Sequence, residues 1–112
     1  MTGARPWRIR LSDAAATDLR DILRWTAERY GAAPARTYRT TLVSAIEGLA
    51  PGPGALGVRD RPELGPSLYT LHPARTGRRA RHLILFRVHG STIDVLRILH
   101  DAMDLPRHVP DA

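Results

Sequence analysis

The chain has 112 residues, no cysteine and a net charge of +6, with 17 basic side chains against 11 acidic ones. This length fits one domain over residues 1–112, with a core at about 7–104 and a tail at 105–112, and the lack of cysteine excludes disulfides and thiolate metal sites. No apolar run approaches the roughly 20 residues of a membrane helix and the first residues lack the apolar core of a signal peptide, so we expect a cytoplasmic protein without a membrane association.

The first elements predicted are an edge strand and a helix. From Trp7 to Leu11, large apolar residues alternate with arginine, which indicates a half-buried strand at a sheet edge. Ser12 or Asp13 can cap a helix that continues at helical spacing to Tyr30, with Gly31 as its stop.

A second helix follows almost at once. Pro34 fits its first turn, and an apolar stripe runs to its end near Ala50. The link is so short that the two helices should form an antiparallel hairpin. We interpret the aromatic residues Trp25, Tyr30 and Tyr38 as core or inter-helix packing rather than as a ligand cage.

The rest of the chain predicts strands. Residues 51–66 are dense in proline and glycine and indicate an irregular surface loop, whereas 67–72 predict a short strand. The runs 82–88 and 93–99 are apolar at odd and even positions, as in strands covered on both faces. A turn containing Gly90 joins them into an antiparallel hairpin, and the tail should form a single helical turn and then fray.

The fold predicted from these elements is α+β, in the order β-α-α-β-β-β(-α). An N-terminal helical hairpin packs on a small, mostly antiparallel sheet, whose last three strands form a meander. Apolar residues of the hairpin strands should build the core: Leu83, Ile84, Leu85, Phe86, Val88, Ile93, Val95, Leu96, Ile98 and Leu99.

No nucleotide-binding, zinc-protease or cysteine-nucleophile motif is present. His100 with Asp101 and Asp104 could form a metal pair or a base with its orienting carboxylate. Metal sites usually need three or four ligands, so we favour a structural role, with His100 hydrogen-bonding at the strand end and Asp104 capping or pairing with an arginine. We expect no metal and no cofactor.

All the basic residues are arginine, and the excess positive charge favours an acidic partner, either nucleic acid or protein. GC-rich coding also explains the arginine usage. Arginines cluster on the turn at residues 75–81, which is either a solvated loop or a partner-binding patch. Arg87 and Arg97 interrupt apolar strands, so their heads must reach water or a carboxylate, for which Asp94, Asp101 and Asp104 are candidates, or a target.

Five pieces in order carry a family resemblance: Asp18-Leu19-x-x-Ile22, Gly31 with Ala35-x-x-Tyr38, Leu42-x-x-x-Ile46-x-x-Leu49-x-x-x-Pro53, the run 81–88 and the run 93–104. Over residues 7–109 the chain resembles the RelE/ParE superfamily of type II toxins, and most closely its ParE branch. The resemblance implies a strand, a helical hairpin and an antiparallel sheet. It also implies a cognate antitoxin, ParD-like or another DNA-binding type, in a hetero-oligomer with the toxin.

The superfamily implies two activities. RelE-like members cut mRNA on the ribosome with basic sheet residues and a tail Arg and Tyr, and by alignment Leu83, Met103 and Val109 stand at three of those positions. ParE-like members instead poison DNA gyrase by contact. We therefore expect a gyrase-binding toxin without catalytic residues, with ribosome-dependent mRNA cleavage as the alternative and a toxin fold without toxicity as a third. The residues expected to face the target or antitoxin are Arg81, Arg87, Arg97, His100, Asp104 and Arg107.

Overall fold

The computed structural model describes residues 7–110. Its helices and strands follow in the order β1 (Arg8–Leu11), α1 (Asp13–Tyr30), α2 (Ala32–Glu47), β2 (Val58–Asp60), β3 (Leu68–Leu71), β4 (His82–His89) and β5 (Thr92–His100). Two short 3-10 helices, η1 (Pro73–Thr76) and η2 (Leu105–His108), lie before β4 and after β5. The α+β class is confirmed, and η2 is the helical turn predicted for the tail.

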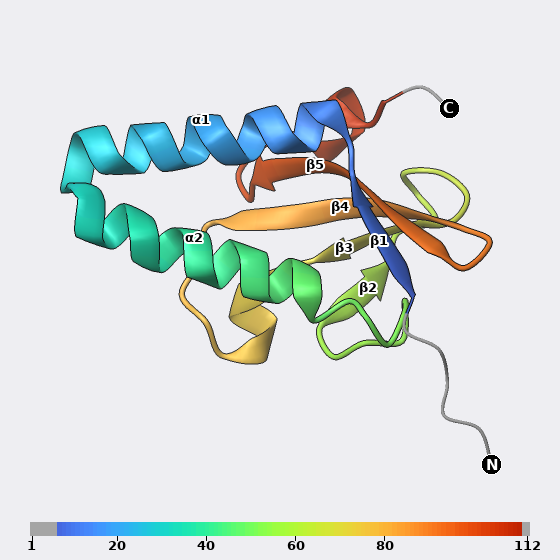
Figure 1. Ribbon diagram of the computed structural model, residues 1–112. Coiled ribbons are helices and arrows are strands. Elements are labelled where there is room, and N and C mark those ends of the chain that lie inside the picture. Colours follow the sequence, from blue (N-terminus) through green and yellow to red (C-terminus); the bar gives the residue numbers. More distant parts are fainter. Residues whose placement is uncertain (1–6, 111–112) are drawn as a thin grey trace, which may run out of the picture.

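The strands form one sheet in the order β1-β5-β4-β3-β2 (Figure 1). Strands β3, β4 and β5 pair antiparallel, which confirms the predicted meander. The first strand pairs with the last in parallel, Arg8 opposite Thr92, so β1 lies at an edge of the sheet as predicted. The first and the last strand of the chain therefore lie side by side in the sheet.

The sheet extends further than the sequence predicted. Residues 58–60 belong to the stretch predicted to be irregular, yet they form β2 and pair antiparallel with β3, Val58 opposite Leu71. Three residues are too few to show a period-2 pattern. Pairing with the neighbouring strand therefore decides this element, and local propensity does not.

The helical hairpin covers one face of the sheet (Figure 1). The Ser12 hydroxyl accepts the Ala15 N–H at 3.0 Å and caps α1, as the sequence indicated. Gly31 joins the helices at a φ of +99°, a conformation that favours glycine. Helix α2 ends at Glu47, before the predicted Ala50, although Leu49 beyond it is fully buried.

The main core lies between the helices and the sheet. Helix residues Leu42 and Ile46 pack there with Ile84 and Phe86 of β4. The Phe86 ring stacks on Tyr69 of β3, with centroids 5.5 Å apart. Trp25 and Tyr30 are 52% and 61% exposed, so the predicted core or inter-helix packing was wrong for these two residues. It is confirmed for Tyr38, which is half-buried and packs against the main core.

The opposite face of the sheet, here called the far face, carries a smaller apolar cluster of Leu83, Leu85 and Leu99. These residues alternate along the strands with those of the main core, so both faces of the hairpin are covered, as predicted. The cover on the far face consists of partly buried Leu64, Leu105 and Val109. Of the predicted core residues, Val88 and Leu96 are only half-buried.

Candidate partner-binding site on the far face of the sheet

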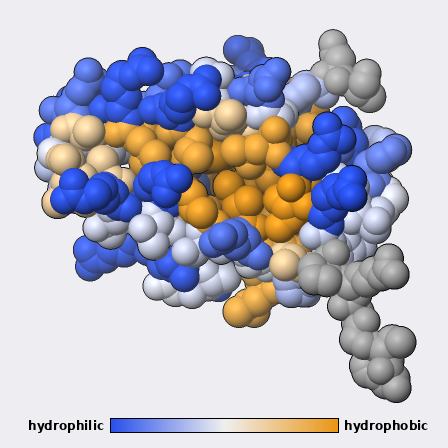
Figure 2. Space-filling model, in the orientation of Figure 1, coloured by the Kyte–Doolittle hydropathy of each residue, from blue (hydrophilic) through white to orange (hydrophobic). Residues whose placement is uncertain are grey.

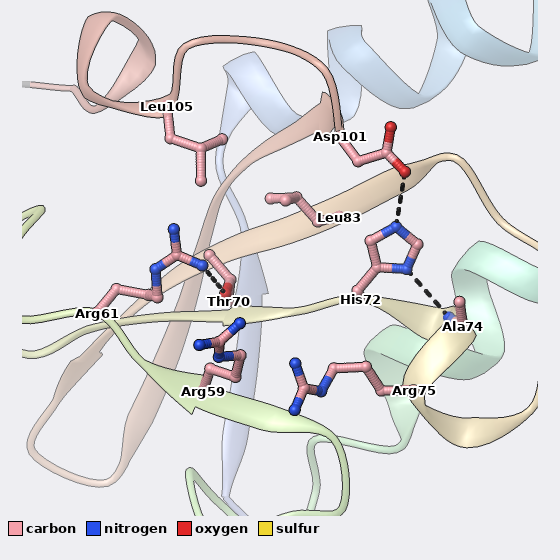
Figure 3. Close-up of a pocket in the computed structure, with 9 residues that line it drawn as sticks. All are labelled: Arg59, Arg61, Thr70, His72, Ala74, Arg75, Leu83, Asp101 and Leu105. Carbon is pink, nitrogen blue, oxygen red and sulfur yellow. Dashed lines mark hydrogen bonds and ion pairs between the residues drawn. The ribbon is translucent and has the colours of Figure 1, made fainter.

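A pocket of about 450 Å³ opens on the far face (Figure 3). Arg59 lies opposite Thr70, and Thr70 lies opposite Leu85, so side chains from β2, β3 and β4 share this face. The pocket is lined by Arg59, Arg61, Thr70, His72, Ala74, Arg75, Leu83, Asp101 and Leu105. We call it the arginine pocket.

One arginine of the pocket is held by its neighbours. The Nε of Arg61 donates to Glu63 at 2.8 Å, and its Nη1 donates to the Thr70 hydroxyl at 3.4 Å. Arg59 and Arg75 are exposed, and neither forms an ion pair within residues 7–110. Two guanidinium groups at the pocket are therefore available to an anion.

Asp101 stands at the other end of the pocket and organises the groups around it. His72 Nδ1 accepts the Ala74 N–H at 3.1 Å, so the ring proton is on Nε2, which donates to the Asp101 carboxylate at 3.0 Å. Arg81 Nε lies 3.6 Å from the same carboxylate. The hydrogen bond from His72, and then the charge of Arg81, lower the pKa of Asp101.

Next to this carboxylate, a half-buried tyrosine, Tyr38, and a half-buried histidine, His82, connect α2 to the start of β4. The Tyr38 hydroxyl accepts the Arg81 N–H at 3.0 Å, so its own proton points to His82 Nδ1, 2.7 Å away. Burial, and then the neighbouring His100, lower the pKa of His82 to about 4. His82 is therefore a neutral acceptor at pH 7, and burial raises the pKa of Tyr38.

The structure brings together only some of the predicted site residues. Arg81 and His100 meet at Asp101, with His100 Nδ1 3.6 Å from that carboxylate. Asp104 and Arg107 pair with each other at 3.3 Å on the exposed tail, which confirms the predicted arginine partner of Asp104. Arg87 lies apart, on β4 opposite Asp94.

Arg97 has a partner that the sequence did not suggest. Its Nε and Nη2 donate to Asp18 of α1 at 2.8 and 2.9 Å, and the Ile98 N–H donates to the same carboxylate at 2.9 Å. Strand β1 pairs with β5 only as far as Leu11 opposite Val95, so Asp18 satisfies the edge of β5 beyond it. The predicted pairing of Arg97 with Asp94, Asp101 or Asp104 was wrong.

The basic turn also separates in space. Arg75 lines the arginine pocket, whereas Arg78 and Arg79 line a different hollow against α2. Arg81 belongs to the group around Asp101. Four arginines that look like one cluster in the sequence therefore face three places.

The structure also shows no catalytic role for Leu83, Met103 and Val109, the positions aligned with the nuclease residues. Leu83 is 7% exposed and forms part of the pocket floor, and Val109 packs on the same apolar cluster. Met103 is 44% exposed. None of the three can move a proton or bind a phosphate. Within residues 7–110, no three acidic or histidine side chains are placed to hold a metal ion.

Sequence reasoning missed Arg59, Arg61 and His72. The signal available was weak: Val58 is followed by three charged residues, Arg59, Asp60 and Arg61, which does not stand out as a strand within the proline- and glycine-rich loop. His72 was assigned only to the end of a strand. Its role depends on Asp101, 29 residues further along the chain.

A helical hairpin on a five-stranded mixed sheet, with the last three strands in a meander and basic side chains on the far face, defines a toxin of the RelE/ParE superfamily. The family model described as "ParE toxin of type II toxin-antitoxin system, parDE" matches residues 9–105. The chain belongs to this family of ParE toxins of toxin–antitoxin modules.

Similar proteins agree with this assignment. The chain is 35% identical to Toxin ParE of Escherichia coli over 102 residues, covering 90% of this chain and 91% of that protein. It is 33% identical to Toxin ParE1 of Mycobacterium tuberculosis over 104 residues, covering 91% and 97%. The solved "Chromosomal ParDE TA system from P. aeruginosa" superposes with a TM-score of 0.67 at 26% identity, covering 87% of this chain and 98% of that chain. The described part of the chain contains no helix long and apolar enough to cross a membrane.

Proposed function

We propose that this ParE toxin inhibits DNA gyrase by binding to it and is neutralised by a cognate antitoxin. The observation that carries the proposal is the family match over residues 9–105, together with relatives of the same length that are named as ParE toxins. The Pseudomonas structure is titled a ParDE system, which supports a ParD-like partner. Gyrase acts on DNA in the bacterial cytoplasm, so we place the toxin there.

Inhibition by binding suits the chemistry of the far face. The pocket has one histidine beside a carboxylate, but both nitrogens of His72 are engaged, by the Ala74 N–H and by Asp101. No lone pair or proton of that ring is available to a substrate. An inhibitor that acts by contact needs shape and charge, which this face supplies without a general base.

The surface proposed to meet gyrase or the antitoxin comprises Arg81, Arg87, His100, Asp104 and Arg107. Arg81 is 74% exposed and Arg107 is 82% exposed along their side chains, so both can change partners at low cost. Arg97 is held by Asp18, with 27% of its side chain exposed. We therefore assign Arg97 to the stability of the fold.

The helical side offers a second surface for the antitoxin. Figure 2 shows apolar surface gathered between α1 and α2, bordered by polar side chains. Exposed apolar patches of this kind mark protein contacts, and the net charge of +6 favours an acidic partner.

The direct experiment adds the purified protein to gyrase and relaxed plasmid. We expect less supercoiling and an accumulation of cleaved DNA. Growth arrest on expression should be relieved when the protein encoded beside the toxin is expressed with it. A protein that leaves gyrase unaffected and cuts mRNA in a translating extract would overturn the proposal.

The second candidate is ribosome-dependent mRNA cleavage, which the arginines beside the His72–Asp101 pair favour. This activity would require His72 to give up one of its two present partners. The variant His72→Ala separates the two functions: it would abolish mRNA cleavage, whereas gyrase inhibition should persist. Mapping RNA ends in the extract, alongside the supercoiling assay, measures both.

A further inference from the structure

The arginine pocket carries more positive charge than its walls neutralise (Figure 3). Glu63 forms an ion pair with Arg61. The Asp101 carboxylate accepts a hydrogen bond from His72 at 3.0 Å and lies 3.6 Å from Arg81. Arg59 and Arg75 are left without an acidic partner among residues 7–110, and both are exposed side chains that line the pocket. A ligand that matches these two guanidinium groups is an anion with at least two oxygens that accept their hydrogen bonds.

The floor of the pocket adds a second requirement. Leu83 is 7% exposed and Leu105 is half-buried beside it. An occupant that touches this floor gains by burying apolar surface, and it excludes water from the arginine contacts, which strengthens them. The ligand therefore combines negative charge with a small apolar group.

The lining favours a peptide over a nucleic acid. Among the described residues, no Phe, Tyr or Trp lines the pocket, whereas sites for single-stranded nucleic acid stack bases on such rings. An Asp or Glu carboxylate needs only the planar fork that Arg59 and Arg75 each present. An aliphatic side chain fits the leucine floor without a stacking partner.

The chain itself shows how such a peptide would sit. Glu63 and Leu64 are consecutive: the carboxylate of Glu63 binds Arg61 at 2.8 Å, and Leu64 packs on the cluster of Leu83, Leu85 and Leu99. One arginine and one edge of the leucine floor are thus already filled by an acidic residue next to an aliphatic one. The rest of the pocket lining has no such occupant, and it includes Arg59, Arg75 and Leu105.

We propose that the arginine pocket receives an acidic, leucine- or isoleucine-bearing segment of the antitoxin, with carboxylates on Arg59 and Arg75 and an aliphatic side chain on Leu83 and Leu105. The inference rests on the proposed function, because it presumes an antitoxin. It adds the place and the chemistry of one contact.

The test compares two double variants with the same change of charge. Arg59→Glu with Arg75→Glu reverses the charge of the pocket. Arg78→Glu with Arg79→Glu, two exposed arginines of the neighbouring turn that line a different hollow, is the control. Thermal melts of both confirm folding. Two probes are titrated by fluorescence anisotropy: a short peptide alternating Glu and Leu, with its Gln-for-Glu analogue, and a single-stranded oligonucleotide. The protein encoded beside the toxin is titrated in the same way.

We expect the pocket variant to bind the Glu–Leu peptide and the antitoxin about 10- to 100-fold more weakly than wild type, the loss expected for charge-assisted contacts. The control variant Arg78→Glu with Arg79→Glu should bind less than about 3-fold more weakly, through its altered net charge alone. The Gln-for-Glu peptide should bind weakly to wild type and to both variants. Equal losses in the two variants would overturn the pocket assignment. Pocket-dependent binding of the oligonucleotide alone would overturn it in favour of nucleic acid.

These outcomes separate the pocket from the function. If wild type binds the antitoxin and inhibits gyrase while the pocket variant behaves as wild type, only the pocket assignment fails. If wild type neither binds the antitoxin nor inhibits gyrase, the proposed function fails, and pocket-dependent binding of the Glu–Leu peptide then supports a site for a different acidic partner.

Discussion

Asp18 should contribute more to the free energy of unfolding than an exposed surface carboxylate does. Its side chain is 15% exposed and accepts three hydrogen bonds, from Nε and Nη2 of Arg97 and from the backbone N–H of Ile98. The substitution Asp18→Ala leaves a half-buried guanidinium and a strand-edge N–H without a partner. Hydrogen bonds to charged groups contribute about 1.5–3 kcal/mol each and are not additive, so we expect a loss of about 3 kcal/mol.

That loss would be large for a chain of this length, because domains are stable by only about 5–15 kcal/mol. Each 1 kcal/mol lowers the melting temperature of a small domain by about 4–8 °C, so Asp18→Ala should melt about 12–24 °C lower. The measurement is urea denaturation followed by circular dichroism. Asp21→Ala is the control, because Asp21 pairs with Arg24 at 3.7 Å and both side chains are more than 60% exposed. This control should cost less than about 0.5 kcal/mol.

A double-mutant cycle isolates the pair. The substitution Arg97→Leu removes the charge that Asp18→Ala leaves without a partner. The double variant should therefore lose about 1–2 kcal/mol less stability than the sum of the losses of the two single variants. Strict additivity, or an Asp18→Ala variant as stable as Asp21→Ala, would refute the assignment of Asp18 as the cap of the β5 edge.

Three further predictions concern other parts of the fold. The free energy of unfolding should fall by about 1–2 kcal/mol as the pH decreases from 6.5 to about 4. Burial lowers the pKa of His82 from 6.5 to about 4, so between these pH values the unfolded chain carries a proton on His82 and the folded chain does not, which favours unfolding. His82→Gln should flatten this slope in urea titrations at several pH values, whereas His89→Gln at the exposed hairpin tip should not; equal slopes would contradict it. Tyr38→Phe should cost about 1–2 kcal/mol, since Arg81 N–H and His82 Nδ1 both lose a partner; wild-type stability in denaturation would count against these bonds. Gly52→Ala should cost about 2–4 kcal/mol, because its Cβ would lie 2.3 Å from Trp7 Nε1 at a φ of +102°. Gly54→Ala, whose Cβ meets nothing within 4 Å, should melt as wild type does, and a matching melt for both glycine variants would exclude the clash.

Much of the fold follows from short-range patterns in the sequence. Ser12 and Gly31 bound α1 because capping and positive φ are properties of single residues and their nearest neighbours. The two apolar runs around Gly90 predict the β4–β5 hairpin, because a short turn leaves antiparallel pairing as the natural arrangement. The resemblance to the ParE branch rests on the same local pieces and agrees with the family match.

The tertiary structure decided what lies next to what. Strand β2 forms because it pairs with β3, which local sequence does not reveal. The exposure of Trp25 could not be predicted either, because an exposed and a buried tryptophan have the same chemistry in the sequence. In the candidate site, the charge and the arginines were visible in the sequence, but their grouping was not.

The residues that matter most are paired across long separations. Tyr38 meets His82 across 44 residues, and Arg97 meets Asp18 across 79. The sequence by itself determined both helices, four of the five strands and the family of this protein, since those depend on neighbours along the chain. Only the sheet, by fixing strand order and register, decided that Arg59 and Arg75 leave a pocket open to an acidic partner while Arg97 is already satisfied within the fold.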